Sequence, residues 1–149
     1  MLDFKRQVDL RWSDLDPNFH LRHSVYYDFG AKLRMDYILS QGIPMESFQK
    51  DHFGPILFRE ECTFRKEVKY GDVIFMSVKV AKLRKDYSRF TFLHEITKED
   101  GTLCAILTVD GAWMDTIQRK LITPPEYIID MCDNAPKPND FQWIESTPK

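Results

Sequence analysis

"SDLDPNFHLRHSVYYDFGAKLRMDYILSQG", residues 13–42, joins a short polar loop to a segment with the pattern of an amphipathic helix. Ser24 is a suitable N-cap and Gly42 a suitable stop signal, so we expect a helix over residues 24–41. Gly30 lies in its middle, where glycine costs about 1 kcal/mol relative to alanine, which predicts a close packing contact. The apolar stripe has the helical spacings of three and four residues and consists of Tyr26, Phe29, Leu33 and Tyr37.

Alternating patterns on both sides of this helix predict a β-sheet. A short strand is expected at residues 5–12, and four longer ones at 58–70, 73–83, 87–97 and 103–114. One helix cannot cover both faces of such a sheet, so we expect an α+β architecture in which the sheet wraps around the helix and another subunit covers the remaining face or an edge. A short helix that starts at the double proline and ends near Cys132 completes one domain, residues 1–134, and residues 135–149 are expected to be an extended or disordered tail.

The composition is that of an ordinary globular protein. Of the 149 residues, 43% are hydrophobic and 30% charged, with a formal net charge of -2, which argues against nucleic acid as the main partner. No apolar run approaches the ~18 residues of a membrane span, and no secretory signal pattern is visible, so we expect no membrane partner and a cytoplasmic location. The three cysteines, Cys62, Cys104 and Cys132, form no CxxC pair, which argues against a thiol–metal site.

The polar loop has three interpretations: a metal site, an acid/base site at a helix start, or a polar turn without chemistry. Asp14, Asp16 and Asn18 begin like a calcium loop, but Phe19 and Val25 replace the glycine and glutamate that such a loop needs. The histidines match no zinc spacing, so we expect no metal. The chain also lacks a GxSxG elbow, a phosphate loop and a dinucleotide fingerprint.

An acid/base site needs only groups that this loop contains, although an aspartate before a helix is often just a turn or cap residue. Asp16 lies seven residues before His23, which stands at or just before the expected helix start. Unpaired amides at a helix start can polarise a carbonyl oxygen, while a loop carboxylate attacks the carbonyl or deprotonates a water. Such an assembly suffices in outline for ester or thioester hydrolysis without a metal.

Several segments, in order, resemble the hotdog-fold thioesterases of the 4-hydroxybenzoyl-CoA thioesterase and acyl-CoA thioesterase type. The resemblance is carried by "RWSDLDPNFHLRHSVYYDFGAKLRMDYI", by "KYGDVIFMSVKV", and by "DGTLCAILTVDGAWMD" followed by "RKLITPPE". It spans residues 5–129 and implies a curved antiparallel sheet wrapped around one long helix. It also implies a hydrolase of acyl-CoA or acyl-carrier-protein thioesters that needs no cofactor, with active sites at the interface of a homodimer or a homotetramer.

The resemblance also assigns roles within the loop by position. Asp16 matches the catalytic carboxylate, which serves as nucleophile or general base. His23 matches the residue whose backbone N–H, and in some subgroups whose side chain, addresses the thioester carbonyl. Asp14 and His20 are expected to brace the loop. Phe19 stands where the family frequently has glycine, which predicts a reshaped loop or acyl pocket.

A second group of expected substrate contacts lies at a strand turn within residues 83–90, a region that can lie near the CoA phosphates in the family. These contacts are Arg84, Lys85, Ser88 and Arg89. The alternative is a solvated hairpin end without a ligand. Tyr26 is likewise expected to contact the substrate, although aromatic residues in a helical stripe are more often plain core.

Two rival functions stay open at this point. An enoyl-thioester hydratase on the same fold resembles D-x-N-P-x-H, whereas "DPNFH" has a different order and places His20 only four residues after Asp16. The second rival function is that of a non-catalytic hotdog module, which binds acyl thioesters or only assembles with partners. Hydration of crotonyl-CoA without thiol release would indicate the hydratase, and tight acyl-CoA binding without thiol release the binding module.

Overall fold

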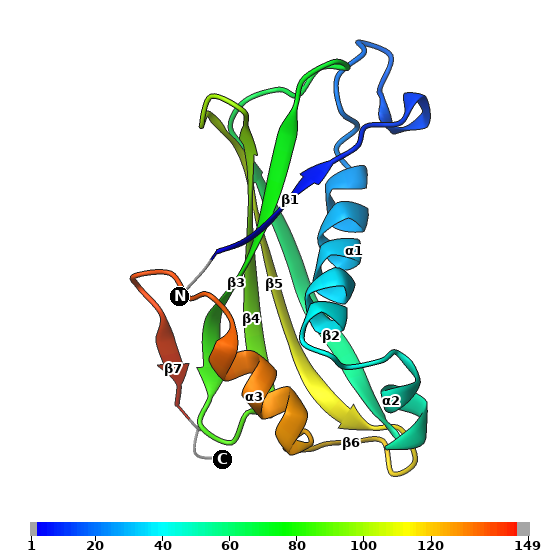
Figure 1. Cartoon of the computed structure of the whole chain (residues 1–149), viewed down its shortest axis with the longest axis vertical. Helices are drawn as coiled ribbons and strands as arrows, with labels where there is room; N and C mark the ends of the chain where they lie inside the picture. The colour runs from blue at the N-terminus through cyan, green and yellow to red at the C-terminus, as the bar shows by residue number, and fades with distance from the viewer. Residues whose placement is uncertain (1–2, 146–149) are drawn as a thin grey trace.

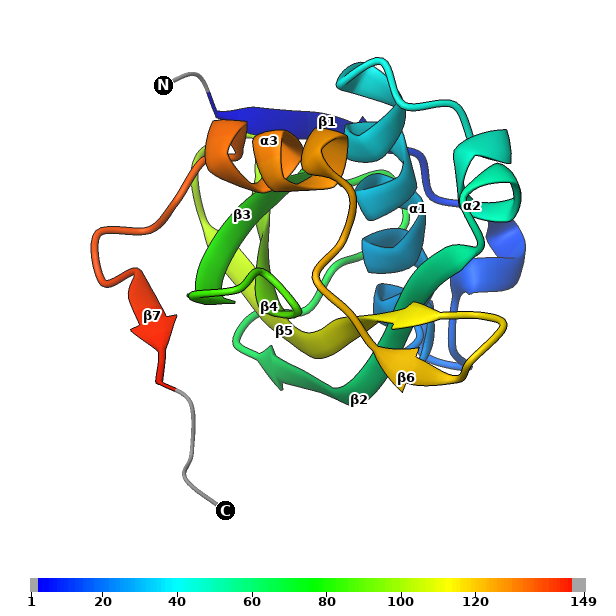
Figure 2. The ribbon, with the colours of Figure 1, turned by 90° about the horizontal axis from the view of Figure 1, so that it is seen from below.

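The computed structural model describes residues 3–145, in which one long helix lies within the curve of an antiparallel sheet (Figure 1, Figure 2). The helix and the main strands are α1 Val25–Ser40, β1 Phe4–Val8, β2 Phe53–Phe64, β3 Ile74–Arg84, β4 Arg89–Lys98 and β5 Leu103–Asp115. The strand order is β1-β3-β4-β5-β2, and all these neighbours are antiparallel. This arrangement confirms the predicted α+β class and the hotdog fold.

Shorter elements close the ends of the sheet. They are the 3-10 helix η1 Trp12–Asp14, α2 Glu46–Lys50, β6 Lys120–Leu121, α3 Glu126–Asn134 and β7 Gln142–Ile144. The first expected strand therefore ends at Val8, and the backbone at Trp12 is already helical. Helix α3 lies where the short C-terminal helix was predicted, and its buried side packs against the sheet through Ile128 and Met131.

Strand β2 differs most from the prediction, which placed it at residues 58–70. It begins at Phe53 and contains Pro55, which an edge strand tolerates because one side of its backbone needs no partner. It ends at Phe64, after which the segment 65–73 turns over the start of α1, where Val68 C=O accepts the amide of Leu21 at 2.7 Å. The chain therefore leaves β2 at one edge of the sheet and enters β3 near the other.

Helix α1 packs unusually close to the sheet at Gly30. A Cβ atom at this position would lie 2.4 Å from Cδ2 of Leu107 on β5, so any larger residue would push the helix outward. Val25, Leu33 and Tyr37 of the same helix are almost fully buried in the main core. The close contact supplies the packing reason that glycine in mid-helix predicts.

The C-terminal segment is attached to the sheet rather than separate from it. The amide of Val80 donates to Pro136 C=O at 2.8 Å, and β7 pairs in parallel with the end of β3. Trp143 packs edge-on against Tyr87, with 5.9 Å between ring centroids. Of the expected extended or disordered tail, the described part is extended and its residues 142–144 join the sheet, while residues 146–149 lie outside the described residues.

Candidate active site

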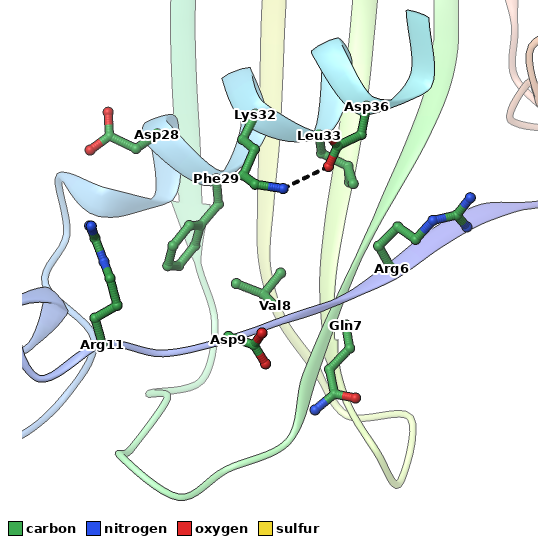
Figure 3. Close-up of a pocket in the computed structure, with 10 residues that line it drawn as sticks. All are labelled: Arg6, Gln7, Val8, Asp9, Arg11, Asp28, Phe29, Lys32, Leu33 and Asp36. Carbon is green, nitrogen blue, oxygen red and sulfur yellow. Dashed lines mark hydrogen bonds and ion pairs between the residues drawn. The ribbon is translucent and has the colours of Figure 1, made fainter. Parts of the chain in front are cut away.

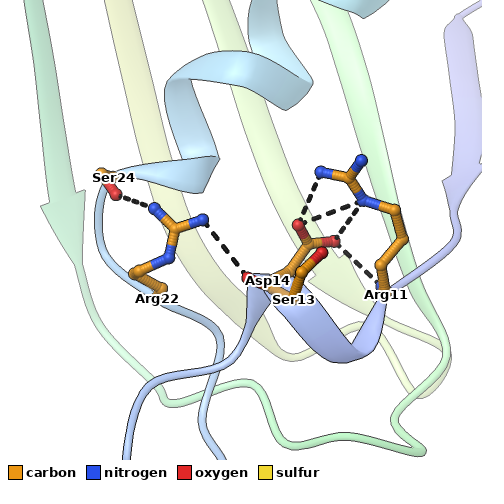
Figure 4. Close-up of polar contacts among 5 residues, drawn as sticks. All are labelled: Arg11, Ser13, Asp14, Arg22 and Ser24. Atoms are coloured by element: carbon orange, nitrogen blue, oxygen red, sulfur yellow. Dashed lines mark hydrogen bonds and ion pairs between the residues drawn. The ribbon is translucent and has the colours of Figure 1, made fainter.

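Asp14 is the buried member of the aspartate pair in the loop before α1 (Figure 4). One carboxylate oxygen accepts the backbone N–H of Arg11 at 2.9 Å, and the other accepts from Nη2 of Arg11 at 2.8 Å. Burial by itself would raise the pKa of Asp14, but these hydrogen bonds and the charge of Arg11 outweigh it and hold the pKa below the ordinary 3.8. Its carbonyl also accepts the amide of Arg22 at 2.7 Å, a contact of the kind that loop bracing requires.

Asp16 has different surroundings two residues further on. Its Oδ1 accepts the amides of Asn18 at 2.8 Å and His20 at 3.1 Å, which fixes the carboxylate on a tight turn. Within residues 3–145, no lysine, arginine or histidine forms an ion pair with it. Phe19 in this turn has φ 63°, a left-handed conformation that favours glycine, so the loop keeps glycine-like geometry around a larger side chain.

The start of α1 leaves backbone donors free beside this loop. The amides of His23 and Ser24, which precede the helix, donate to no acceptor within the described part of the chain. The amide of Val25 donates to Arg22 C=O at 3.1 Å, so the helical turn begins just before α1. Arg22 also donates through its guanidinium to Ser24 Oγ and to Ser13 C=O, which joins the loop to the helix start (Figure 4).

A cavity of about 290 Å³ brings Asp16 and the helix start together. Its wall consists of the polar loop, the first turn of α1 and residues 64–67 at the end of β2. The predicted site residues that line it are Asp16, His20, His23 and Tyr26. Four of the nine residues proposed from sequence therefore line one cavity. Asp14 does not line it, but its carbonyl accepts the amide of Arg22 within the same loop.

The cavity has one apolar and one polar wall. Tyr26 is 3% exposed, and its ring packs edge-on against Phe64 with 5.1 Å between centroids. Burial raises the pKa of Tyr26 to about 12, so its hydroxyl stays protonated near neutral pH. On the polar side, Nε2 of His20 lies 2.7 Å from Oε2 of Glu67, and the His20 backbone forms a β-bridge with Lys69.

Sequence reasoning missed two cations at this site, Arg65 and Lys66, which also line the cavity. They were assigned to the middle of a strand, whereas the strand ends one residue before them. Both of their amides donate to Cys104 C=O, at 2.8 and 3.0 Å, which fixes the backbone at this point. In the sequence, the end of this strand is marked only by the two basic residues that directly follow the apolar Phe64.

The second predicted group does not meet this cavity within one chain. Residues 84–89 form the hairpin between β3 and β4, at the far end of the sheet from the Asp16 loop (Figure 1). Strand β3 has 11 residues, which corresponds to about 36 Å of extended backbone. Ser88 is buried and donates to Asp86 at 2.6 Å, and Nζ of Lys85 lies 4.7 Å from the ring centroid of Trp143.

Of that second group, Arg89 lines a different cavity, of about 430 Å³, to which Arg59 and Lys82 also contribute. The guanidinium of Arg89 lies 5.0 Å from the ring centroid of Phe58. This cavity therefore combines cations with an aromatic face, but it lies apart from Asp16. The expected contacts of Arg84, Lys85, Ser88 and Arg89 with CoA stay predictions.

A hollow of about 370 Å³ between β1 and α1 contains none of the predicted site residues (Figure 3). Its floor is apolar, with Val8, Phe29 and Leu33, and its rim carries charges of both signs. Lys32 and Asp36 on this rim neutralise each other across 2.8 Å. The structure gives the other charges on this rim no arrangement that points to a ligand, and the hollow is not taken further as a candidate site.

The Asp16 cavity offers a carboxylate, free helix-start amides and nearby cations, a set suited to the polarisation and cleavage of a carbonyl compound. No three His, Cys, Asp or Glu side chains in residues 3–145 are grouped as a metal site would require. Among the helices of that range, none combines the length and the apolar character that crossing a membrane requires.

The curled sheet, the long helix and a carboxylate loop at the helix start define a hotdog-fold protein of the thioesterase class. The model of the thioesterase-like superfamily matches residues 10–135, and the chain belongs to this superfamily. A search of curated proteins by sequence finds no significant match.

Solved structures with the same fold include several thioesterases. A 1,4-dihydroxy-2-naphthoyl-CoA thioesterase from Synechocystis superposes with a TM-score of 0.79 at 14% identity, over 89% of this chain and 96% of that one. A hypothetical protein from Staphylococcus aureus, solved in complex with CoA, gives 0.80 at 21% identity over 99% and 96%. A DHNA-CoA thioesterase from Staphylococcus aureus gives 0.76 at 19% identity over 89% and 88%. At these identities the likeness establishes the fold.

Proposed function

We propose that the protein hydrolyses acyl-CoA or acyl-carrier-protein thioesters in the cavity at Asp16. One observation carries the proposal: Asp16, whose carboxylate is held by two backbone amides, and His23, whose backbone amide has no acceptor among the described residues, line the same open cavity. Membership of the thioesterase-like superfamily supports the reaction class. The structural neighbour solved with CoA supports a CoA ester as the substrate form.

In the proposed reaction, the amide of His23 or Ser24 donates to the thioester carbonyl oxygen and stabilises the charge that develops there. Asp16 then follows one of two routes. As nucleophile, it attacks the carbonyl carbon and expels the thiolate, and water hydrolyses the resulting anhydride. As general base, it takes a proton from a water molecule that attacks the same carbon. Both routes consume one water and release a carboxylic acid and a thiol.

The proposal includes a homodimer, or a homotetramer built from two such dimers, with the sites at subunit interfaces. Strand β2 supports it, because β2 pairs only with β5 among the described strands and leaves its outer edge open. The apolar side chains of Leu57, Phe58 and Phe64 on this strand are between 45% and 52% exposed. An open, apolar strand edge is a typical site for pairing with a second chain.

The test is thiol release from a panel of aromatic, short and long acyl-CoA esters, with the wild-type protein and Asp28→Asn as a matched control. Asp28 is an exposed acid in the first turn of α1 and does not line the Asp16 cavity. We expect turnover of at least one ester, unaffected by the control substitution. Binding of acyl-CoA without thiol release would contradict the hydrolase and favour the non-catalytic binding module. Hydration of crotonyl-CoA with the thioester intact would favour the enoyl-thioester hydratase.

A further inference from the structure

Arg34 is a buried cation without an acidic partner. It lies on α1, is 7% exposed, and forms no ion pair with any Asp or Glu of residues 3–145. Glu60 on β2 is the carboxylate whose attraction reaches it, and this attraction only partly offsets the lowering of the Arg34 pKa by burial. A buried charge costs several kcal/mol when it is left unpaired, so its presence needs a reason.

Arg34 is held in place by a neutral histidine. Ser77 C=O lies 2.9 Å from Nδ1 of His94 and can only accept, so this nitrogen carries the proton. Nε2 of His94 is then the acceptor for Nη1 of Arg34 at 3.0 Å. Burial and the charge of Arg34 lower the pKa of His94 to about 3, so the histidine is neutral and the pair carries one positive charge at neutral pH.

The fold makes room for this pair at Gly30. A Cβ there would lie 3.3 Å from Nη1 of Arg34 and 3.4 Å from Cδ2 of His94, besides its clash with Leu107. Three positions on two elements, α1 and β4, thus combine to keep a guanidinium in the interior. The hydrogen bond to His94 leaves the other guanidinium nitrogens available to a ligand.

Arg34 lines a cavity of about 200 Å³ between α1 and the sheet, distinct from the one at Asp16. Its other walls are almost entirely apolar, from residues such as Met35, Leu57 and Phe92. Trp113 also lines it, and the indole N–H of Trp113 is buried without an acceptor among the described residues. The cavity therefore combines apolar surface with one cationic hydrogen-bond donor, the guanidinium of Arg34, and its lining contains no carboxylate.

We propose that this cavity binds a carboxylate carried on a small apolar body, with the carboxylate on Arg34 and the body against the aliphatic and aromatic walls. An Arg–carboxylate contact can be bidentate, and it is stronger where water is excluded. Neither the hollow between β1 and α1 nor the cavity at Asp16 has an arginine buried in this way.

The carboxylate can belong to a free acid or to the far end of a carboxyacyl thioester. The cavities at Asp16 and at Arg34 are both lined by α1 and β2. His23 and Arg34 are 11 residues apart, which corresponds to about 16 Å along the helix axis. The carboxyacyl source rests on the proposed thioesterase function, whereas binding of the free acid does not.

The first test measures binding of hexanoate and benzoate, against hexanamide and benzamide, by calorimetry and by the rise in Tm of the full chain. A ligand that binds the folded state raises Tm, and at equal ligand concentration a tighter ligand raises it more. We expect each acid to bind the wild type at least tenfold more tightly than its amide. Arg34→Met should abolish this preference, whereas Lys32→Met, which removes an exposed cation from the same helix, should retain it.

A second variant keeps the proposal testable if Arg34→Met does not fold. Ala31 is an exposed lining residue, so Ala31→Phe should fill the cavity without removing Arg34, and should reduce acid binding at least tenfold. Equal binding of acids and amides by the wild type would overturn the proposal. So would full acid binding by both cavity variants, or no binding of either acid.

The second test separates the two sources by comparing adipyl-CoA with hexanoyl-CoA in the thiol-release assay. A preference for adipyl-CoA of at least tenfold in kcat/KM that Arg34→Met removes and Lys32→Met keeps would assign the cavity to the substrate. Acid binding without this preference would assign it to a free acid. Acid binding with no thiol release from any ester would contradict the proposed function while supporting the cavity.

Discussion

Asp14 and Asp16 lie two residues apart, yet the fold gives them opposite surroundings. Asp14 is fully buried and bound by the backbone and guanidinium of Arg11. Asp16 lines an open cavity and bonds only to backbone amides of its own turn. The comparison teaches that charge type and spacing alone do not single out the carboxylate proposed to be catalytic. What distinguishes the two is which of them keeps an oxygen free for a ligand.

The largest expected effect comes from Asp16→Asn. An Asn oxygen can accept the same two amides, so the free energy of unfolding should change by less than about 0.5 kcal/mol, as for substitutions away from buried features. Without the carboxylate, kcat/KM for the best thioester should fall at least ~100-fold. Thiol release and urea unfolding measure the two quantities. Activity close to wild type would remove Asp16 from the mechanism.

The converse effect is expected for Asp14→Asn. The amide places a donor against the guanidinium of Arg11 within a buried site, so the free energy of unfolding should fall by about 1–3 kcal/mol. The loss in kcat/KM should be smaller than for Asp16→Asn when both are measured on folded protein. If Asp14→Asn proved as stable as wild type but inactive, the roles assigned to the two aspartates would have to be exchanged.

Acid titration sharpens the same comparison. The folded-state pKa of Asp14 is lowered, so its stabilising contribution is complete above the ordinary pKa of 3.8 and is lost as the pH falls towards the lower folded value. The difference in unfolding free energy between wild type and Asp14→Asn should therefore be constant from pH 7 to about 5 and shrink below about pH 4. A difference that grows on acidification would contradict the hydrogen-bonded, ionised state of Asp14.

The smallest expected effect concerns the turn that carries Asp16. Phe19 has φ 63°, so Phe19→Gly should be more stable than Phe19→Ala by about 1 kcal/mol, because alanine keeps the left-handed strain and glycine does not. Both variants lose the ring contact with Trp12, which makes them a matched pair. Equal unfolding free energies of the two variants would show that the turn relaxes when the ring is removed.

The features that could be predicted from the sequence are those encoded locally. Helix α1 occupies Val25–Ser40 against an expectation of residues 24–41, because its stripe and end signals are contiguous in the chain. The ends of β2 were misplaced because they depend on pairing with β5 and on the segment that crosses the start of α1. Strand β7 was missed because its three residues acquire strand geometry only beside β3.

In the candidate sites, too, contacts between neighbours in the sequence were predictable and contacts between distant residues were not. The Asp16 loop and the start of α1 are adjacent in sequence, so their meeting was predictable. Arg34 and His94 are 60 residues apart, and His94 had no visible partner in the sequence. Arg65 and Lys66 were hidden by the wrong end of β2. The expected CoA contacts at residues 84–89 lie too far from Asp16 for one chain to join them, so the sequence could not show which site they serve.

The strand order has a consequence for how the chain is made. Phe4 pairs with Val78, so β1 can find its neighbour only after 74 further residues have been synthesised. At about 5–20 residues per second, this strand waits roughly 4–15 s on the ribosome, while α1 needs no distant partner to begin winding. Slow or paused translation before β3 would therefore lengthen the time for which an unpaired strand is exposed to chaperones and proteases.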